Sequence, residues 1–427
     1  MKIAIIGTGI SGLSAAWLLN QKHEITVFEA DNRIGGHANT VEIEGHPAID
    51  TGFIVFNDWT YPNLLKLFDE FSVPSVPSDM SFAVSLNEKA YEYSSNALFS
   101  QILNYINPKH WWLLLDLMRF YKSVEKGGFK EKETLGKYLQ RKRYSKVFIE
   151  RHIYPMAAAI WSADPAHIAR FPMSSFTQFF KNHGLLILDV KKRPKWRTVA
   201  GGSQTYVEAL SEPFKEKIQL NTKITDIIRH QDYIEIVKEG GKSELFEHVV
   251  LAVHSDQALD ILARPTSEEE EVLKAFPYKP NVAYLHQDER LMPKSKKSWA
   301  SWNFLQDDPN QEPYVTYWMN LLQPFIDRGQ NYFVTINPPF EPSNILYQTN
   351  YAHPQYLETA QQGWEKIKKI QGFKRTWFCG AWCGYGFHED GLSSGLAVGE
   401  ALGGVKRPWI ENDISPAGVN CNPYFEE

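Results

Sequence analysis

The chain begins with a short apolar run, a helical pattern and a second apolar run. Lys2–Ile6 is rich in β-branched residues, and this pattern predicts a strand buried on both faces. Apolar residues recur at helical spacing over Leu13–Leu19, and Ile25–Phe28 is again strand-like. A strand, a helix and a strand in this order predict a βαβ unit and a parallel sheet.

Helical spacing dominates the next part of the chain, interrupted by one hairpin. Tyr61–Val73 is amphipathic and predicts a helix. Ser81–Leu86 and Ala90–Tyr93 alternate as the two strands of a hairpin. From Ala97 to about Phe180 the pattern is mainly helical, with breaks at proline and glycine residues.

The second half of the chain returns to strands before a last helix. Lys217–Val237 predicts two strands, and Val249–Val253 predicts a further buried strand. Long aromatic runs between Ala283 and Ile336 predict a broad antiparallel sheet. Gly391–Leu402 predicts a helix with small residues along it, Gly395 among them. The pattern as a whole predicts an α/β (α+β) fold.

Three glycines after the first strand have the spacing of a dinucleotide-binding turn. Gly7, Gly9 and Gly12 satisfy G-x-G-x-x-G, with Ser11 inside the turn. The first glycine permits the tight turn, the second lets a pyrophosphate approach, and the third lets the helix pack closely. Glu29 ends the second strand, where an acid accepts the ribose hydroxyls and disfavours a 2′-phosphate. The alternative is a glycine-rich turn of an unrelated α/β domain.

Further glycine turns favour FAD over NAD as the dinucleotide. Gly35 and Gly36 suit a second turn beside the same pyrophosphate, with Arg33 free to add positive charge. Gly52 and Phe53 begin another turn of close approach. An NAD domain does not need these turns, whereas a longer, deeply buried FAD does.

The sequence here resembles the flavin-containing amine oxidoreductase superfamily, which includes amine oxidases and phytoene-type desaturases. Its members carry E-A-x-x-R-x-G-G-R, and this chain matches the pattern from Glu29 and Ala30 through Gly36. His37 stands in place of the usual second Arg. The resemblance implies a Rossmann-like FAD-binding domain with an interleaved substrate domain of mixed sheet and helices.

The same resemblance covers the segment from Thr376 to Gly404. It implies a turn at Gly380 and a helix N-terminus that faces the flavin N1 and C2 carbonyl. Ala381 stands where the family usually has an acid. The backbone amides assigned to the flavin are those of Asp390, Gly391 and Leu392. Family precedent also implies an adenine contact at Ile224 and places Ala252 near the nucleotide.

The two ends of the chain must therefore meet at one cofactor, which implies interleaved domains. The expected FAD-binding domain comprises residues 1–80, 195–275 and 370–410, and the substrate domain comprises 81–194 and 276–369. Residues 411–427 are expected to form a C-terminal tail.

Composition limits the functional classes. A net charge of −5 gives no general attraction to nucleic acid, and three cysteines do not form a disulfide framework. We expect no metal site, no signal peptide and no membrane-spanning segment, and hence a cytoplasmic protein. The sequence does not determine the oligomeric state.

His388 and Glu389 are the candidate catalytic residues, because they precede the helix expected to face the flavin. His388 would act as an acid or base near neutral pH and Glu389 would orient it. The alternative is that the triplet caps the helix, with Asp390 as N-cap. Trp161–Asp164 is expected to line the cavity. The remaining histidines considered are interpreted as structural: His183, His254, His286 and His353.

The substrate is predicted from what the chain lacks and from the resemblance. Amine oxidases of the superfamily hold a lysine near flavin N5, and its equivalent here is Asn281, with Lys279 two residues before it. Trp382 and Tyr385 are only rough substitutes for the usual tyrosine pair.

The chain resembles a subgroup related to flavin domains associated with cyclopropane-fatty-acyl synthases. This implies desaturation of a lipid acyl chain, methylated or cyclopropane-related; the alternatives are an amine oxidase and a non-catalytic flavin-binding accessory protein.

One segment suggests contact with a membrane surface. Asn107–Lys132 combines two tryptophans and a leucine run with basic residues, and Lys137–Lys146 adds further basic residues. Such a helix can lie in a membrane interface, here the inner membrane face. The alternative is a core helix with a solvated basic face.

Overall fold

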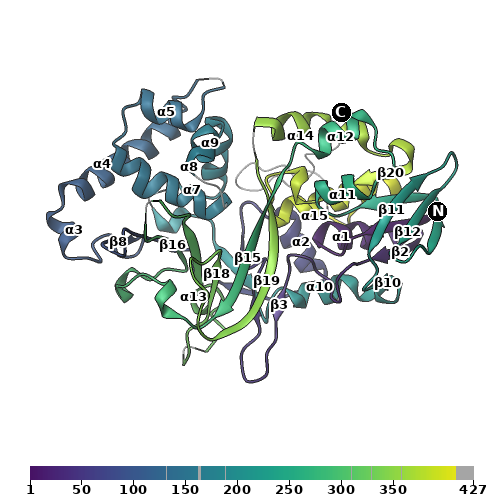
Figure 1. Cartoon of the computed structure of the whole chain (residues 1–427), viewed down its shortest axis with the longest axis horizontal. Helices are drawn as coiled ribbons and strands as arrows, with labels where there is room; N and C mark the ends of the chain where they lie inside the picture. The colour runs from purple at the N-terminus through teal and green to yellow at the C-terminus, as the bar shows by residue number, and fades with distance from the viewer. Residues whose placement is uncertain are drawn as a thin grey trace.

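The computed structural model describes residues 1–130, 132–161, 165–187, 189–308, 310–327, 329–356 and 358–409. Figure 1 shows the N-terminus and the parallel sheet at one end of the molecule, and helices α3, α4 and α5 at the other. The predicted tail 411–427 lies outside the described residues. The predicted domain boundaries stay a prediction, although the strands of the two main sheets fall within the segments assigned to them.

A five-stranded parallel sheet forms the first region and contains the predicted βαβ unit. The strand order is β10-β2-β1-β14-β20, and every neighbouring pair is parallel. Its strands are β10 (Ile218–Gln219), β2 (Glu24–Phe28), β1 (Lys2–Ile6), β14 (His248–Leu251) and β20 (Thr376–Phe378). The segment predicted as two strands, 217–237, contains β10, the whole of β11 (Ile224–Arg229) and all but the last residue of β12 (Ile234–Lys238), and the last two belong to a separate small sheet.

Helix α1 (Ile10–Leu19) and helix α15 (His388–Gly403) pack closely and join the two ends of the chain. Glycines recur every fourth residue on α15 and so lie on one face. A β-carbon on Gly391 would lie 2.9 Å from the Ile10 side chain, and one on Gly399 would lie 3.0 Å from Leu18. One on Gly395 would overlap the Ser11 carbonyl oxygen. The glycine stripe therefore allows the backbones of the two helices to approach.

A seven-stranded sheet forms the second region, in the order β19-β15-β18-β17-β16-β7-β8. Its strands are β19 (Ile345–Pro354), β15 (Tyr278–His286), β18 (Phe333–Ile336), β17 (Tyr314–Trp318), β16 (Trp302–Gln306), β7 (Phe82–Leu86) and β8 (Tyr91–Ser94). The runs between 283 and 336 pair antiparallel as predicted, and so does the hairpin β7–β8. The sheet is mixed, however, because β7 joins β16 in parallel. Periodicity along one strand does not specify the direction of a distant partner.

Helices cover one end of this sheet (Figure 1). They are α3 (Leu103–Ile106), α4 (Pro108–Glu125), α5 (Leu135–Arg141), α6 (Lys146–Phe148), α7 (Tyr154–Trp161), α8 (Pro165–Arg170) and α9 (Met173–Asn182), with a π-helix at Ile149–Ile153. The helical interpretation of 97–180 is thus confirmed. Their inner faces belong to one large cluster of buried aromatic and aliphatic side chains.

The remaining elements connect the two regions. The helices are α2 (Pro62–Glu70), α10 (Gln204–Ser211), α11 (Ser255–Ile261), α12 (Ser267–Leu273), α13 (Met319–Leu322) and α14 (Glu358–Ile370). The strands are β3 (Thr40–Val41), β4 (Ile49–Asp50), β5 (Phe56–Asn57), β6 (Ser75–Pro77), β9 (Trp196–Val199), β11 (Ile224–Arg229), β12 (Ile234–Lys238) and β13 (Ser243–Phe246). Of these, α2 packs against α15 near its start.

Candidate functional site

The turn between β1 and α1 has the backbone geometry of a dinucleotide site. Gly7 has φ +100°, and a β-carbon there would lie 2.6 Å from the Ala252 carbonyl oxygen. A β-carbon on Gly12 would overlap the Gly7 carbonyl oxygen. Gly9 is the N-cap of α1, and a β-carbon on it would meet no protein atom within 4 Å. The first amides of α1, including that of Ser11, therefore border open space, as an anion site at a helix N-terminus requires.

Glu29 lies at the carboxyl end of β2, where the sequence places a ribose-binding acid. Its carboxylate accepts from the Thr8 amide at 2.9 Å and from the Asp31 amide at 3.0 Å, and the Thr8 hydroxyl also donates to it. Ala30 follows and is exposed. These donors hold the carboxylate beside the first glycine turn. The position fits contact with a ribose.

The second glycine turn lies against the first. Gly35 has φ +109° and Gly36 has φ +56°, and a β-carbon on Gly36 would lie 3.1 Å from the Gly9 Cα. Arg33 was expected to add charge here, but its guanidinium donates to the Gly36 carbonyl at 2.7 Å and to the Ala38 carbonyl at 3.2 Å. The arginine thus stabilises the turn, because its donors satisfy carbonyls that the turn exposes.

His388 occupies an apolar place between two aromatic residues. Its ring stacks on Phe53 with centroids 3.8 Å apart, and its Nε2 lies 2.6 Å from the Tyr206 hydroxyl. Burial lowers the pKa of His388 to about 3. The imidazole is therefore neutral at pH 7, and the acid or base role of His388 stays a prediction. Gly52 sets the position of Phe53, since a β-carbon on it would overlap the His37 carbonyl oxygen.

Glu389 does not orient His388, because its carboxylate is bonded to the start of α2. It accepts from the Asn63 amide and side chain, both at 2.9 Å, and from the Leu64 amide at 3.0 Å. Burial raises the pKa of Glu389 to about 7, against the lowering effect of these donors. Glu389 caps the N-terminus of α2, which lacks a capping side chain of its own.

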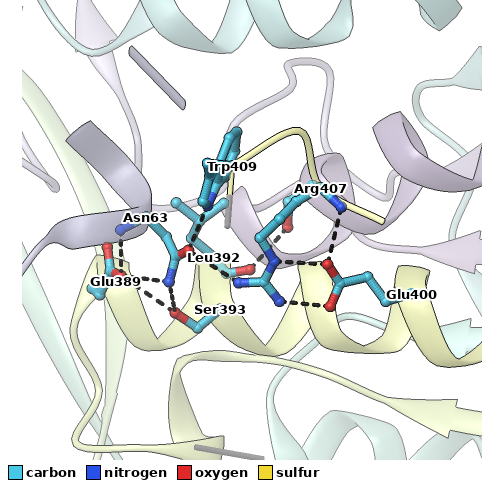
Figure 2. A network of polar contacts seen from close by, with 8 residues as sticks. Asn63, Glu389, Leu392, Ser393, Glu400, Arg407 and Trp409 are labelled. Atoms are coloured by element: carbon cyan, nitrogen blue, oxygen red, sulfur yellow. Dashed lines mark hydrogen bonds and ion pairs between the residues drawn. The ribbon is translucent and has the colours of Figure 1, made fainter. Parts of the chain in front are cut away.

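Figure 2 shows that this contact belongs to a larger polar network. The Asn63 side-chain oxygen accepts from Arg407 at 3.0 Å and from the Trp409 indole at 2.8 Å. Arg407 also donates twice to Glu400 at 2.7 Å. The network thereby fixes α2, α15 and the segment that follows α15 relative to one another.

Helix α15 begins after the turn at Gly380, as expected, but Asp390 is not its N-cap. Phe387 is the N-cap, and the Asp390 carboxylate accepts from its amide at 2.9 Å. Asp390 therefore caps the helix from its third residue instead of from the N-cap position. Gly391 and Leu392 are buried beside α1, and the Gly380 amide donates to the Ser394 hydroxyl at 3.0 Å. The helix N-terminus and the glycine turns thus lie at one end of the parallel sheet, on the same side as α1.

Three histidines far apart in the sequence lie together beside the second glycine turn, and no local pattern predicts their association. The His37 ring centroid lies 5.7 Å from that of His254, 5.8 Å from that of His353 and 4.9 Å from that of Tyr351. Each of the three imidazoles stays partly exposed. His254 stacks on Tyr278 with centroids 4.3 Å apart. His254 could have been found, since it comes two residues after Ala252, but no local signal marks His353.

Burial and mutual repulsion keep these histidines neutral. The surrounding protein lowers the pKa of His37 well below its ordinary value, with His353 and His254 adding to the effect. The pKa of His353 falls to about 4, and that of His254 is also lowered, in both cases mainly by burial. The cluster therefore adds no positive charge at neutral pH.

Asn281 and Lys279 both lie beside this cluster, since on the paired strands Lys279 is opposite His353 and Asn281 is opposite Tyr351. The Asn281 side chain is buried and lies 2.9 Å from Nδ1 of His353, and it accepts from Asn337 at 2.8 Å. Lys279 is paired at 3.5 Å with Glu312, which is exposed. The Lys279 ammonium thus pairs with Glu312, whereas the Asn281 amide contacts His353.

The other predicted residues have simpler surroundings. Ile224 is buried at the start of β11. His286 bonds Thr335 at 2.7 Å, and His183 bonds the Phe179 carbonyl at 2.9 Å, in agreement with structural roles. Most of 161–164 lies outside the described residues.

Within the described ranges, no group of three or more His, Cys, Asp or Glu side chains is arranged to hold a metal ion, and no helix is long and apolar enough to cross a bilayer.

Comparison with known proteins agrees with this geometry. The family model for flavin containing amine oxidoreductases matches residues 10–320. The chain belongs to this family. Membership confirms the resemblance to this superfamily, whose members are FAD-dependent oxidoreductases. The residues around the glycine turns fit this cofactor, since they combine an open helix N-terminus with an acid at the end of β2.

Two curated relatives have moderate similarity to the chain. Coproporphyrinogen III oxidase of Staphylococcus aureus is 24% identical over 291 residues, covering 58% of this chain and 59% of the relative. A putative flavin-containing monoamine oxidase, AofH, of Mycobacterium tuberculosis is 24% identical over 256 residues, covering 57% and 54%. The chain thus spans a little over half the length of these relatives.

A solved structure matches along nearly the whole chain. The CLA-producing fatty acid isomerase from P. acnes superimposes with a TM-score of 0.66 at 14% identity, covering 94% of this chain and 97% of the other. At this identity the likeness shows the fold. It confirms the predicted mixed α/β architecture.

Proposed function

We propose that the protein removes hydrogen from neighbouring carbons of a lipid acyl chain, with a methylated or cyclopropane-related acyl phospholipid as substrate. The observation that carries the proposal is the side chain beside the histidine cluster. Asn281 occupies this position, and the nearby Lys279 is paired with Glu312. The family's amine-oxidising members use a lysine there. With Asn281 taken as the equivalent of that lysine and the Lys279 ammonium paired with Glu312, the proposal favours a substrate other than an amine.

A second observation supports an apolar substrate. Aromatic rings run without a break from α4 to the residue before α15. Phe120 lies 6.4 Å from Phe176, which stacks on Phe180 at 4.1 Å. Phe179 lies 6.1 Å from Phe180 and 5.3 Å from Phe387, the N-cap of α15. Phe120, Phe176, Phe179 and Phe180 are buried and packed against one another, so this core gives the neighbourhood of the start of α15 an apolar character.

The residues of the chain would hold the cofactor and shape the site around it. The glycine turns and the α1 amides would receive the pyrophosphate, and Glu29 the ribose. The amides at the start of α15 would face the isoalloxazine. FAD, when bound, supplies the acceptor for the hydrogen removed from the substrate. The neutral histidines leave the site without a fixed positive charge, which suits an uncharged carbon chain.

Amine oxidation is the second candidate, because one curated relative is named as a monoamine oxidase. Trp382 and Tyr385, which stand in for the family's usual tyrosine pair, make different contacts. The Trp382 indole is buried and donates to the Val253 carbonyl at 3.1 Å, whereas the Tyr385 ring packs against Trp364. Neither contact resembles a pair of rings that cage an amine. The acyl-chain substrate is therefore preferred.

The test is anaerobic bleaching of the bound flavin. Purified protein loaded with FAD is mixed with phospholipid extract dispersed in detergent micelles, and in parallel with a panel of polyamines. The proposal expects loss of flavin absorbance with phospholipid alone. Bleaching by a polyamine would establish the amine oxidase, and no bleaching by either would favour the accessory protein. Micelles remove any requirement for binding to a bilayer.

A further inference from the structure

An apolar surface covers the outer side of α3 and the first half of α4. Isolated exposed apolar residues are common on proteins, but a contiguous group of large ones marks an interaction site. The most exposed side chains of the group are Ile102 (86%), Ile106 (79%), Leu103 (68%), Leu115 (61%) and Trp112 (60%). Tyr105, Trp111 and Met118 complete it at 39% or more. We call these residues the α3–α4 face.

The opposite side of α4 packs in the core. The helix is therefore held in place, and its exposed apolar side chains are not the result of a missing contact within the chain. Leu113, Phe120 and Val124 are fully buried in the main hydrophobic cluster. Asn107 caps the helix by accepting from the Lys109 amide. The alternative interpretation, a core helix with a solvated basic face, therefore describes only one side of α4. The other side faces solvent.

Positive charge follows the apolar residues along the same helix. Lys122 and Lys126 are exposed, and they line an open hollow of about 470 Å³ together with Leu115, Met118 and Arg119. Arg119 is held in place by Asp116 at 2.8 Å and by the Lys142 carbonyl. The hollow is thus lined by both apolar and cationic side chains.

We propose that the α3–α4 face and this basic hollow dock on the surface of an anionic lipid bilayer. Tryptophan and leucine side chains with adjacent lysines are the composition of helices that lie in a bilayer interface. The local positive charge opposes the net charge of −5 of the whole chain, so it matches an anionic surface specifically. Acyl tails would contact the apolar part and phosphates the lysines.

A second copy of the chain is a poorer occupant of this surface. In a symmetric dimer the same patch meets itself. Lys122 and Lys126 would then be buried against the same patch of the copy, where each α4 offers one exposed carboxylate for two lysines. Glu125 is the exposed acid of α4, and Asp116 is buried and bonded to Arg119. Self-association therefore becomes an outcome that the test must separate.

The inference rests on the proposed function and extends it, because it states how an acyl chain would reach the site. Figure 1 places α3 and α4 at the end of the molecule away from the parallel sheet. The packed aromatic rings described above extend from Phe120, on the buried side of α4, to Phe387. A bilayer bound at the α3–α4 face would lie at the α4 end of this aromatic core.

The experiment measures co-sedimentation with vesicles of phosphatidylcholine alone and of phosphatidylcholine mixed with phosphatidylglycerol. The full chain should sediment with the mixed vesicles at low salt and be released by high salt. Lys122→Gln and Lys126→Gln should each weaken binding by roughly fivefold. Trp112→Ser and Leu115→Ser should each weaken it by roughly tenfold. All four positions are exposed, so the variants should keep the fold.

Matched controls lie on the far side of the molecule. Leu245→Ser on β13 replaces a leucine that is 52% exposed, and Lys223→Gln replaces an exposed lysine. Neither should alter binding. The proposal fails if the wild-type chain does not sediment with anionic vesicles at low salt, or if the controls weaken binding as much as the α3–α4 variants. It also fails if the face instead forms a dimer in solution that Trp112→Ser dissolves.

This outcome is independent of the proposed function. Vesicle sedimentation requires no turnover, and flavin bleaching in micelles requires no bilayer. Loss of sedimentation with retained bleaching overturns the docking surface alone. Sedimentation without bleaching by phospholipid overturns the substrate and leaves the surface standing.

Discussion

The backbone of Gly395 in α15 touches that of Ser11 in α1, so closely that a β-carbon on Gly395 would overlap the Ser11 carbonyl oxygen. This contact joins the two ends of the chain. It also sets the distance between the amides at the start of α1 and those at the start of α15, which together would frame the cofactor.

Gly395→Ala should destabilise the protein by about 3 kcal/mol, because neither backbone can move away without disturbing a buried helix. Unfolding of the apoprotein in urea measures the free energy. Ala401→Ser is the control on an exposed position of the same helix and should change it by less than about 0.5 kcal/mol. An unchanged stability for Gly395→Ala would refute the close packing.

Gly9→Ala should separate cofactor binding from folding. The added methyl group would meet no protein atom within 4 Å, so the apoprotein should lose at most about 1 kcal/mol, from weaker capping of α1. The methyl group would fill the space assigned to the pyrophosphate, and the Kd for FAD should rise at least roughly tenfold. Gly12→Ala is the contrasting variant, because its β-carbon overlaps Gly7 and should impair folding itself.

Titration of FAD into the apoproteins, with thermal unfolding in parallel, distinguishes the two effects. If Gly9→Ala binds FAD as the wild type does, the pyrophosphate does not lie at the start of α1.

Glu389→Gln should change how stability depends on pH. The folded-state pKa of about 7 lies above the ordinary value of 4.5, so the stabilising contribution is complete below pH 4.5 and is lost as pH rises through 7. The wild type should therefore lose stability relative to Glu389→Gln across this window, by on the order of 3 kcal/mol. Urea unfolding at several pH values measures the difference. A difference that is constant from acid to alkaline pH would show that Glu389 has an ordinary pKa.

His388→Phe should have the opposite pH dependence. The folded-state pKa of about 3 lies below 6.5, so the neutral imidazole stabilises the protein above pH 6.5, and this contribution is lost as pH falls toward 3. The variant should lose less stability on acidification than the wild type, by up to about 1.4 kcal/mol per pH unit. Tyr206→Phe serves as control, since it removes the hydroxyl bonded to His388 and keeps the imidazole.

Between pH 4.5 and 6.5 the contributions of Glu389 and His388 oppose each other, so the single variants are needed to reveal either one. Parallel curves for His388→Phe and the wild type would contradict the buried, neutral histidine.

The sequence pattern was sufficient to predict the structure where all the determining residues lie within one short segment. The β-branched run of β1, the glycines of the first turn and the acid at Glu29 lie within one βαβ unit, and their spacing specifies both structure and ligand. The hairpin β7–β8 was equally predictable. The parallel pairing of β7 with β16 was not, because that pairing joins segments more than 200 residues apart.

The features of the candidate site can likewise be divided into those that the local sequence predicts and those that it does not. The sequence by itself determined the glycine turns, the helix with small residues at its contact face and the family of the protein, since these depend on backbone conformation and short-range spacing. Only the tertiary structure brought His37, His254 and His353 together, bonded Glu389 to α2 and left the outer side of α4 exposed. The physical reason is that burial, and hence pKa and surface character, is set by neighbours that fold in from remote parts of the chain.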